Sequence, residues 1–403
     1  MCDVVGRALA QAQGRGTGLS RRSLLRGVGA TTVAGGVAAA AARAADAQSG
    51  AGSAAAARRY RTRLVLLGTA GGPVILPDEP RGGGQRFGVS TAIVYGDHVY
   101  VVDLGNGAHL RLVEAGLGDG ELNTGFANVR GVLFTHLHSD HVAEWPAVYA
   151  TGSMNVGGNQ DGIEVFGPGD RGSLPRVFPP GRPAPPVINP DDPTPGITGM
   201  TGYLRQAFAA DLNDRTRDSN FTDPESLFRL HDIDISPYWT VDPEGVPPRL
   251  ERPIPVWTDG DVRVTATLVD HHPTAPSFAY RFDTPDGSIV VSGDTTVSEN
   301  LIDLARDADY LVHEVIDPLF VEQLVATLPP EQAEPVKAHL LESHTTIEQV
   351  GRDVAEPAGV RHLVLSHLVP SNNDLRRWRR AQDGFSGRLI VGEDLMQLGV
   401  GRP

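Results

Sequence analysis

Three histidines and one aspartate fall within the six residues His136-Leu137-His138-Ser139-Asp140-His141, directly after the apolar segment 129–135. The segment predicts a buried strand. Side chains alternate in direction along an extended chain, so His136 and His138 can point the same way. Asp140 and His141 come after the bend and can face a second point. This spacing favours two adjacent metal ions over one, and over a solvated loop that is rich in histidine by chance.

Three further segments place a residue type that binds metals just beyond a predicted strand. These residues are His271 or its neighbour His272, Asp294, and His367. A single histidine at the end of a strand is more often structural than functional. Four such places along one chain, each able to lie on a common sheet edge, indicate one shared centre.

The first 47 residues predict an export signal and not a part of the fold. A twin-arginine pattern, Ser20 to Leu25, precedes the small-residue run 27–42 and the Ala45-Asp46-Ala47 cleavage pattern. The run is too short and too rich in Gly and Ala for a membrane span. We therefore expect a periplasmic or secreted chain beginning near Gln48, with no stable membrane insertion after the signal is removed.

The net charge limits which partners the protein can bind, and the cysteine content limits which metals it can hold. The full chain carries a net charge of −14, and removing 1–47 takes away six Arg and two Asp, which leaves −18. An acidic protein repels nucleic acid, so we expect no nucleic-acid partner. Cys2 is the only cysteine and lies in the signal. Any metal must then be held by His and carboxylates, which favours hard or borderline ions.

The mature chain predicts an α/β sandwich, with a flexible leader over 48–58 and one domain over 59–403. Strands are expected at 63–67, 90–95, 98–103, 129–135, 163–166, 262–269, 278–282, 288–292, 310–315, 362–366 and 389–391. Helices are expected at 107–115, from 142 to 149, and at 202–213, 297–306, 346–355 and 374–382. The stretch 151–260 holds 17 of the 31 prolines and predicts an irregular insertion that could serve as a lid. Its aromatic side chains could line a substrate pocket or form a small core of their own.

Several ordered motifs give the chain a family resemblance. They are Leu67-Gly68-Thr69-Ala70-Gly71-Gly72, Val102-Asp103-Leu104-Gly105, the 136–141 cluster, Asp270-His271-His272-Pro273, Ser292-Gly293-Asp294-Thr295, His313-Glu314, Ser343-His344-Thr345-Thr346 and Leu365-Ser366-His367. With these motifs, spread between Leu64 and Val400, the chain resembles the metallo-β-lactamase superfamily, within it the branch of ribonuclease Z and the zinc-dependent arylsulfatases. The resemblance implies an αββα sandwich.

The resemblance also implies two Zn²⁺ ions, with Mn²⁺ or Fe²⁺ as alternatives, and a role for each ligand. One ion would be held by His136, His138 and His271, and the other by Asp140, His141 and His367, with Asp294 bridging. A metal-bridging hydroxide would be the nucleophile, oriented by Asp140. His271 is favoured over His272, because in similar chains a single His is followed by Gly at this place, yet the choice stays open.

The same resemblance implies roles for further residues. Glu314 and His344 match residues that assist proton transfer to the leaving group. His313 is expected to pack or orient. Asp103, at the end of its strand, is either a partner of a ligand histidine or a turn cap.

The leading hypothesis is an exported dinuclear hydrolase of small esters, with sulfate esters ahead of phosphodiesters. Ribonuclease Z enzymes carry a tRNA-gripping arm between the strand of Tyr280-Arg281 and the Gly293-Asp294 motif, and here only a short hairpin joins them. The alternatives are a lactonase or other carboxylic ester hydrolase, and a non-catalytic metal- or ligand-binding protein. A homodimer is compatible with the family, although the sequence locates no interface.

Overall fold

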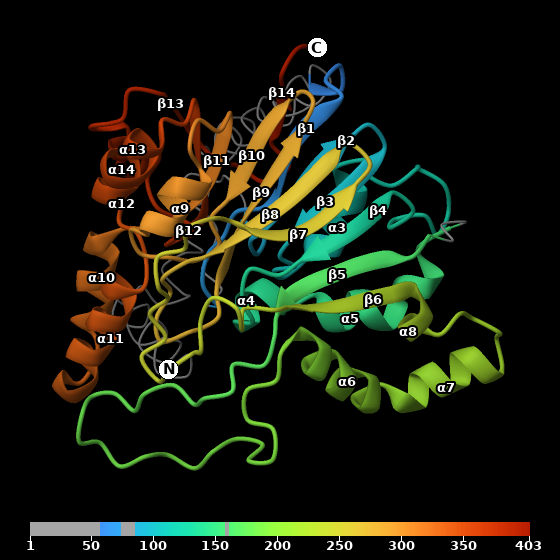
Figure 1. Cartoon of the computed structure of the whole chain (residues 1–403), viewed down its shortest axis with the longest axis horizontal. Helices are drawn as coiled ribbons and strands as arrows, with labels where there is room; N and C mark the ends of the chain where they lie inside the picture. Colours follow the sequence, from blue (N-terminus) through green and yellow to red (C-terminus); the bar gives the residue numbers. More distant parts are fainter. Residues whose placement is uncertain (1–56, 74–84, 158–160) are drawn as a thin grey trace, which may run out of the picture.

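Two mixed sheets, each of seven strands, pack face to face and form the centre of the molecule (Figure 1). The computed structural model describes residues 57–73, 85–157 and 161–403. The predicted signal, 1–47, and most of the leader lie outside these residues. The first sheet, in spatial order, consists of β14 (Gln397–Val400), β1 (Thr62–Gly68), β2 (Ser90–Tyr95), β3 (His98–Val102), β4 (Val129–Leu133), β5 (Ile163–Pro168) and β6 (Phe228–Ile233). The second consists of β13 (Arg388–Val391), β12 (His362–Val369), β11 (Tyr310–Ile316), β10 (Gly287–Val291), β9 (Phe278–Thr284), β8 (Val262–Leu268) and β7 (Ile254–Asp259).

Alternating side chains of the buried strands supply two different cores. Leu64 and Leu66 of β1 face the second sheet and pack in the core between the sheets. Val65 and Leu67 face the opposite way and pack against helices. A strand that is apolar on both faces needs cover on both, and this is why the sheets are enclosed in helices.

Helices cover the outer face of each sheet. Over the first sheet lie α3 (Ala108–Glu114), α4 (Ser139–Val142), α5 (Trp145–Thr151), α6 (Ile197–Ala207), α7 (Ala209–Arg217) and α8 (Pro224–Leu227). Beside the second sheet lie α9 (Glu299–Leu304), α10 (Pro318–Val325), α11 (Pro330–Glu342), α12 (Ile347–Gln349), a π-helical turn at Val350–Ala355, α13 (Glu356–Ala358) and α14 (Leu375–Trp378). The buried aromatics Trp145 of α5 and Trp378 of α14 anchor these two layers. The order helices, sheet, sheet, helices is the predicted sandwich.

The stretch 151–260 is more regular than predicted. Besides β5 it contains β6 and β7, which are edge strands of the two different sheets, and the helices α6, α7 and α8. The longest described segments without helix or strand are 169–196 and 234–253, and the first of these makes the long excursion between β5 and α6 in Figure 1. The prediction of one irregular insertion was therefore wrong for about half of the stretch.

Among the described residues, the aromatic side chains of this stretch form no separate core, and the pocket that Phe166 and Tyr238 border is lined by none of the candidate metal ligands. Phe228 packs on Trp145 in the main core, with 5.1 Å between ring centroids. Tyr238 and Trp239 border the core between the sheets, whereas Tyr203 and Phe221 are exposed. None of the described helices is both long and apolar enough to cross a membrane.

Candidate metal centre

The first group of candidate ligands comes from the loop after β4 and the loop after β8. His136 and His138 follow β4, and His271 follows β8. One nitrogen atom of each lies within 4.8 Å of the others. The Nδ1 of His138 is 3.3 Å from the Nε2 of His271. Three imidazole nitrogens thus converge on one point.

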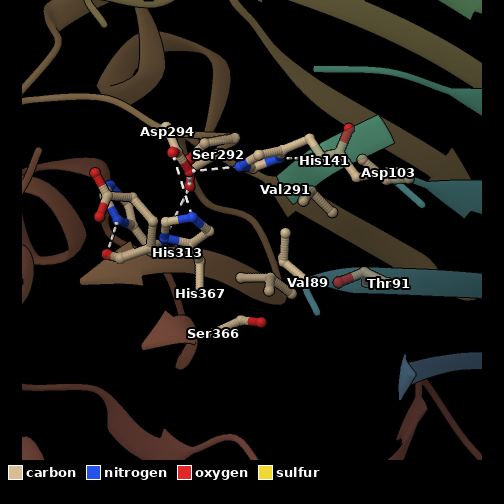
Figure 2. Close-up of a pocket in the computed structure, with 14 residues that line it drawn as sticks. Val89, Thr91, Asp103, His141, Val291, Ser292, Asp294, His313, Ser366 and His367 are labelled. Carbon is tan, nitrogen blue, oxygen red and sulfur yellow. Dashed lines mark hydrogen bonds and ion pairs between the residues drawn. The ribbon is translucent and has the colours of Figure 1, made fainter. Parts of the chain in front are cut away.

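The second group is built on α4, β12 and the loop after β10. It consists of Asp140, His141, Asp294 and His367, whose ligand atoms also lie within 4.8 Å of one another. Asp294 contacts both neighbours, with Oδ1 3.3 Å from His141 Nε2 and Oδ2 3.3 Å from His367 Nε2. Figure 2 shows the three side chains pointing toward one another.

Asp294 lies between the two groups. Its Oδ2 is also 3.9 Å from the Nε2 atoms of His136 and His271. Gly293 permits this position, because its φ is +61° and a Cβ there would lie 2.7 Å from the carbonyl oxygen of Phe278. The seven predicted ligands therefore form two adjacent donor groups that share one carboxylate.

A β-bulge directs His367 into the site. The pairing of β11 with β12 shifts register between His313 and Val315, and His367 has a φ of 44° at this shift. An extra residue at a bulge re-aims the side chain next to it. Strand β12 continues to Val369, whereas the sequence predicted its end at Ser366, so His367 belongs to the strand and not to a loop after it.

Neighbouring groups hold the ligand rings in orientation. The Nδ1 of His141 is 2.8 Å from Asp103 Oδ2, and Asp103 also accepts from the backbone N–H of Thr135. The Nδ1 of His271 is 2.8 Å from the carbonyl oxygen of Ser343. The Nε2 of His138 is 2.8 Å from the hydroxyl of Thr274. Such contacts fix ring orientation and tautomer. Of the two roles predicted for Asp103, the structure shows the contact with a candidate ligand histidine. Thr274 carried no signal in the sequence, and Ser343 stood in the motif 343–346 without a role of its own.

Burial and charge suit these residues to a cation. Within the described part of the chain, the Nε2 atoms of His136 and His141 are buried without a hydrogen-bond partner. Burial holds the pKa of His136 and of His271 well below the ordinary value, so both are neutral and able to coordinate. Burial would raise the pKa of Asp140, but His141 and His367 lower it, so the carboxylate is charged. Unpaired imidazole nitrogens around charged carboxylates are the donor set that a divalent metal requires.

Glu314 and His344 form a hydrogen-bonded pair beside the donor groups. The Nδ1 of His344 is 3.0 Å from Glu314 Oε1, which also accepts from the backbone N–H groups of Thr295 and Thr345. Burial acts to lower the pKa of His344, but the charge and hydrogen bond of Glu314 raise it to about 9. The imidazole therefore carries a proton at neutral pH in the metal-free protein.

Two other predicted residues lie outside the donor groups. His272 turns away, with Nδ1 2.8 Å from Asp270 Oδ1, which leaves His271 as the candidate ligand. His313 donates to the carbonyl oxygen of Glu314 through Nδ1 at 2.7 Å and borders a small cavity beneath the centre, shown in Figure 2. The ring is fully buried, and its Nε2 has no hydrogen-bond partner among the described residues.

Comparisons with known proteins agree with this geometry. Residues 83–331 match the family model of the metallo-beta-lactamase superfamily. A ribonuclease Z from Mycobacterium avium (strain 104) is 30% identical over 344 residues, which are 84% of this chain and 99% of that protein. A ribonuclease Z from Mycobacterium marinum is 28% identical over 341 residues, covering 84% and 98%. The crystal structure of the short form of human tRNase Z aligns with a TM-score of 0.50 and 18% identity over 84% of this chain and 100% of that chain, a likeness of fold alone.

Proposed function

The chain belongs to the metallo-beta-lactamase superfamily and is a hydrolase of that fold, and from this premise we propose that it is an exported, dinuclear enzyme that cleaves small esters. Sulfate esters and phosphodiesters are the proposed substrate classes. The observation that carries the proposal is the pair of donor groups joined by Asp294 beside the Glu314–His344 pair. Export is proposed from the twin-arginine pattern, whose residues lie outside the described structure.

We propose that each donor group holds one ion, and that this ion is Zn²⁺ because the ligands are histidines and carboxylates. When bound, the two ions supply an acidified water as nucleophile and polarise the ester. The protein keeps the donors in place through Asp103, Thr274 and the carbonyl oxygen of Ser343. Gly72 assists through its backbone N–H, which lies 3.1 Å from Asp140 Oδ2 and so limits the positions of that carboxylate.

His344 is the proposed acid for the leaving group. Its Nδ1 is engaged with Glu314, which leaves Nε2 to give a proton to the departing oxygen. The Glu314 carboxylate is fixed by two backbone N–H groups, so it can stabilise the protonated ring without moving. An ester with a poor leaving group needs this proton most.

Two observations support a small substrate over RNA. The chain carries a net charge of −14, which disfavours a polyanion. Strands β9 and β10 are joined by a tight turn between Thr284 and Gly287, with no added arm. Cleavage of tRNA precursors is the second candidate, because the relatives that match most of this chain are named ribonuclease Z.

A substrate panel with one variant tests the proposal. The zinc-loaded protein is assayed with a nitrophenyl sulfate, bis-nitrophenyl phosphate, a lactone, a cephalosporin and a tRNA precursor. We expect turnover of the sulfate or the phosphodiester. His344→Ala should keep its metal content yet lower kcat by about 10²- to 10⁴-fold on esters with poor leaving groups, and by less on nitrophenyl esters. His98→Ala, at an exposed ring, is the control.

Other outcomes point elsewhere. Cleavage of the tRNA precursor without turnover of small esters would make the chain a ribonuclease. Turnover of the lactone alone would indicate a carboxylic ester hydrolase. A protein that holds its metals and turns over nothing would be a binding protein.

A further inference from the structure

Thr345 links two parts of the candidate centre through its hydroxyl. It follows His344 directly, and its side chain is fully buried. Its Oγ1 donates to the carbonyl oxygen of Thr295 at 2.7 Å. Thr295 in turn follows Asp294, the carboxylate that the two donor groups share. One hydrogen bond therefore joins the segment that carries the proposed acid to the segment that carries the shared carboxylate.

The residues joined by this bond are the two that hold the Glu314 carboxylate. The backbone N–H groups of Thr295 and Thr345 each donate to Glu314 Oε1 at 3.1 Å. His344 Nδ1 lies 3.0 Å from the same oxygen. The other oxygen, Oε2, is buried without a hydrogen-bond partner among the described residues. The position of the carboxylate therefore depends on the two N–H groups that hold Oε1.

Among the described residues, the Thr345 hydroxyl makes the only hydrogen bond between the segments 292–298 and 343–346. Each segment is otherwise tied to a different neighbour. The N–H of Thr296 donates to the carbonyl oxygen of Asp270 at 2.8 Å, and the carbonyl oxygen of Thr345 accepts from the N–H of Ile316 at 3.0 Å. Without the hydroxyl, the two N–H groups on Glu314 would be positioned independently of each other.

The ring that Glu314 holds lies between the donor groups. The centroid of the His344 ring is 5.0 Å from that of His271 and 6.0 Å from that of His367, one candidate ligand of each group. Thr295 and Thr345 are both fully buried, so water from the solvent has no access to the place of the hydroxyl. Loss of this donor would leave a buried carbonyl oxygen with one partner fewer.

We propose that Thr345 is a positioning residue for the leaving-group acid. Its hydroxyl keeps the two backbone N–H groups at one separation, so that both stay on Glu314 and the carboxylate keeps the His344 ring in place. Thr345 itself gives no proton to the ester. The inference rests on the proposed function, because it needs an ester whose leaving group takes a proton from His344.

Thr345→Val tests this role, because valine keeps the shape of the side chain and removes the hydroxyl. With the zinc-loaded protein we expect kcat to fall about ten- to a hundredfold on an ester with a poor leaving group, since a displacement of about 1 Å can cost on the order of 10²-fold. The fall on nitrophenyl esters should be smaller, and zinc content and KM should stay as in the wild type. Thr345→Ser, which keeps the hydroxyl, should restore most of the lost rate.

Thr201→Val is the matched control. The Thr201 hydroxyl is also buried and also donates to a carbonyl oxygen at 2.7 Å, that of Ile197. It lies on α6, which carries no candidate ligand and no partner of Glu314 among its residues. Both valine variants should lose stability in urea unfolding. Only Thr345→Val should change the ratio of kcat between esters with poor and good leaving groups.

A proton resonance separates this inference from the proposed function. In the zinc-loaded protein, the His344 Nδ1 proton that is bonded to Glu314 should give a downfield signal, which His344→Ala lacks. We expect this signal in the wild type, Thr345→Ser and Thr201→Val, and its broadening or loss in Thr345→Val. If no ester is turned over but this pattern is seen, the function fails and the positioning role stands. If esters are turned over while Thr345→Val matches Thr201→Val in both the kcat ratio and the signal, the positioning role is overturned.

Discussion

Gly71 contacts the ring of a candidate ligand. A Cβ at this position would lie 2.5 Å from His367 Nδ1 and 2.7 Å from the His367 carbonyl oxygen. Only the backbone of a glycine can approach the imidazole so closely. The glycine pair in the motif Leu67 to Gly72 thus has a packing reason, since Gly72 provides an N–H to Asp140 and Gly71 provides space for His367.

We expect Gly71→Ala to displace His367 and to weaken one of the two metal sites. The affinity for Zn²⁺ should fall by on the order of ten- to a hundredfold, the range found when groups supporting a ligand are changed. Titration with Zn²⁺ against a chromophoric chelator measures this. Gly202→Ala, on α6 with nothing near its added Cβ, should bind like the wild type. Equal affinities for both variants would contradict the role assigned to Gly71.

At the scale of elements, Asp317 joins α10, β12 and α14. Its Oδ1 accepts from the N–H of Leu319 at the start of α10, and both oxygens accept from Arg377 of α14 at 2.6 and 2.9 Å. Its side chain is only 3% exposed. Burial acts to raise the pKa of Asp317, but Arg377 and Asn373 hold it below the ordinary value.

Removing this charge should destabilise the protein in a pH-dependent way. Asp317→Asn should lower the free energy of unfolding by about 2 to 4 kcal/mol at pH 7, because it leaves Arg377 without its partner. A carboxyl with a lowered pKa stabilises the fold above its ordinary pKa, and this contribution is lost as the pH falls through the folded value. Urea unfolding should thus show a constant difference from wild type between pH 5 and 8 that shrinks below about pH 4.

The exposed pair of Arg352 and Asp353 provides the comparison for this experiment. Asp353→Asn should lower the free energy of unfolding by about 0 to 1 kcal/mol, as is usual for surface ion pairs. A similar small loss in Asp317→Asn would show that Asp317 does not join these elements.

The sequence was informative for central strands and weak for edges. β1, β2 and β10 each contain a run of at least three apolar residues, and their predicted limits agree with the structure to within one residue. β6 and β7 were missed, because an edge strand has one free side and tolerates the charges of 228–233 and the proline at 255. α10 and α11 were missed as well, although Pro318 and Pro330 stand at the first position of each helix, where proline is favourable; only Pro335 interrupts a helical pattern.

The candidate ligands could be marked from the sequence, whereas only part of their surroundings could, namely Asp103, Glu314 and His344. The donors are rare residue types placed after apolar strands, so the sequence alone marks them. The register shift that aims His367 and the contact of Thr274 with His138 depend on pairing between distant segments. No local pattern encodes these contacts.

At the scale of the whole molecule, the candidate centre joins the two sheets. His136, His138, Asp140 and His141 follow β4 of the first sheet, whereas His271, Asp294 and His367 belong to the second. Ions bound here would therefore connect both halves of the sandwich. A ligand that binds only the folded state stabilises that state by mass action. The gain is about 2.7 kcal/mol for each site when the free ligand concentration is a hundred times Kd.

Removing the metal should consequently lower the melting temperature of the entire fold. In calorimetry we expect chelator-treated protein to unfold several degrees lower than zinc-loaded protein, still in a single transition. In His136→Ala and in His367→Ala, the difference in melting temperature between zinc-loaded and chelator-treated protein should be smaller than in the wild type. Identical melting curves with and without zinc would mean that no ion links the sheets.

The pairing of β1 with β14 has a consequence for the way the protein is made. Thr62 pairs with Val400, so the edge strand β14 and its neighbour β1 come from opposite ends of the described chain. During synthesis one side of β1 stays unpaired until the final strand has left the ribosome. A nascent polypeptide stopped short of Gln397 would therefore leave one edge of β1 unpaired and open to pairing with another chain.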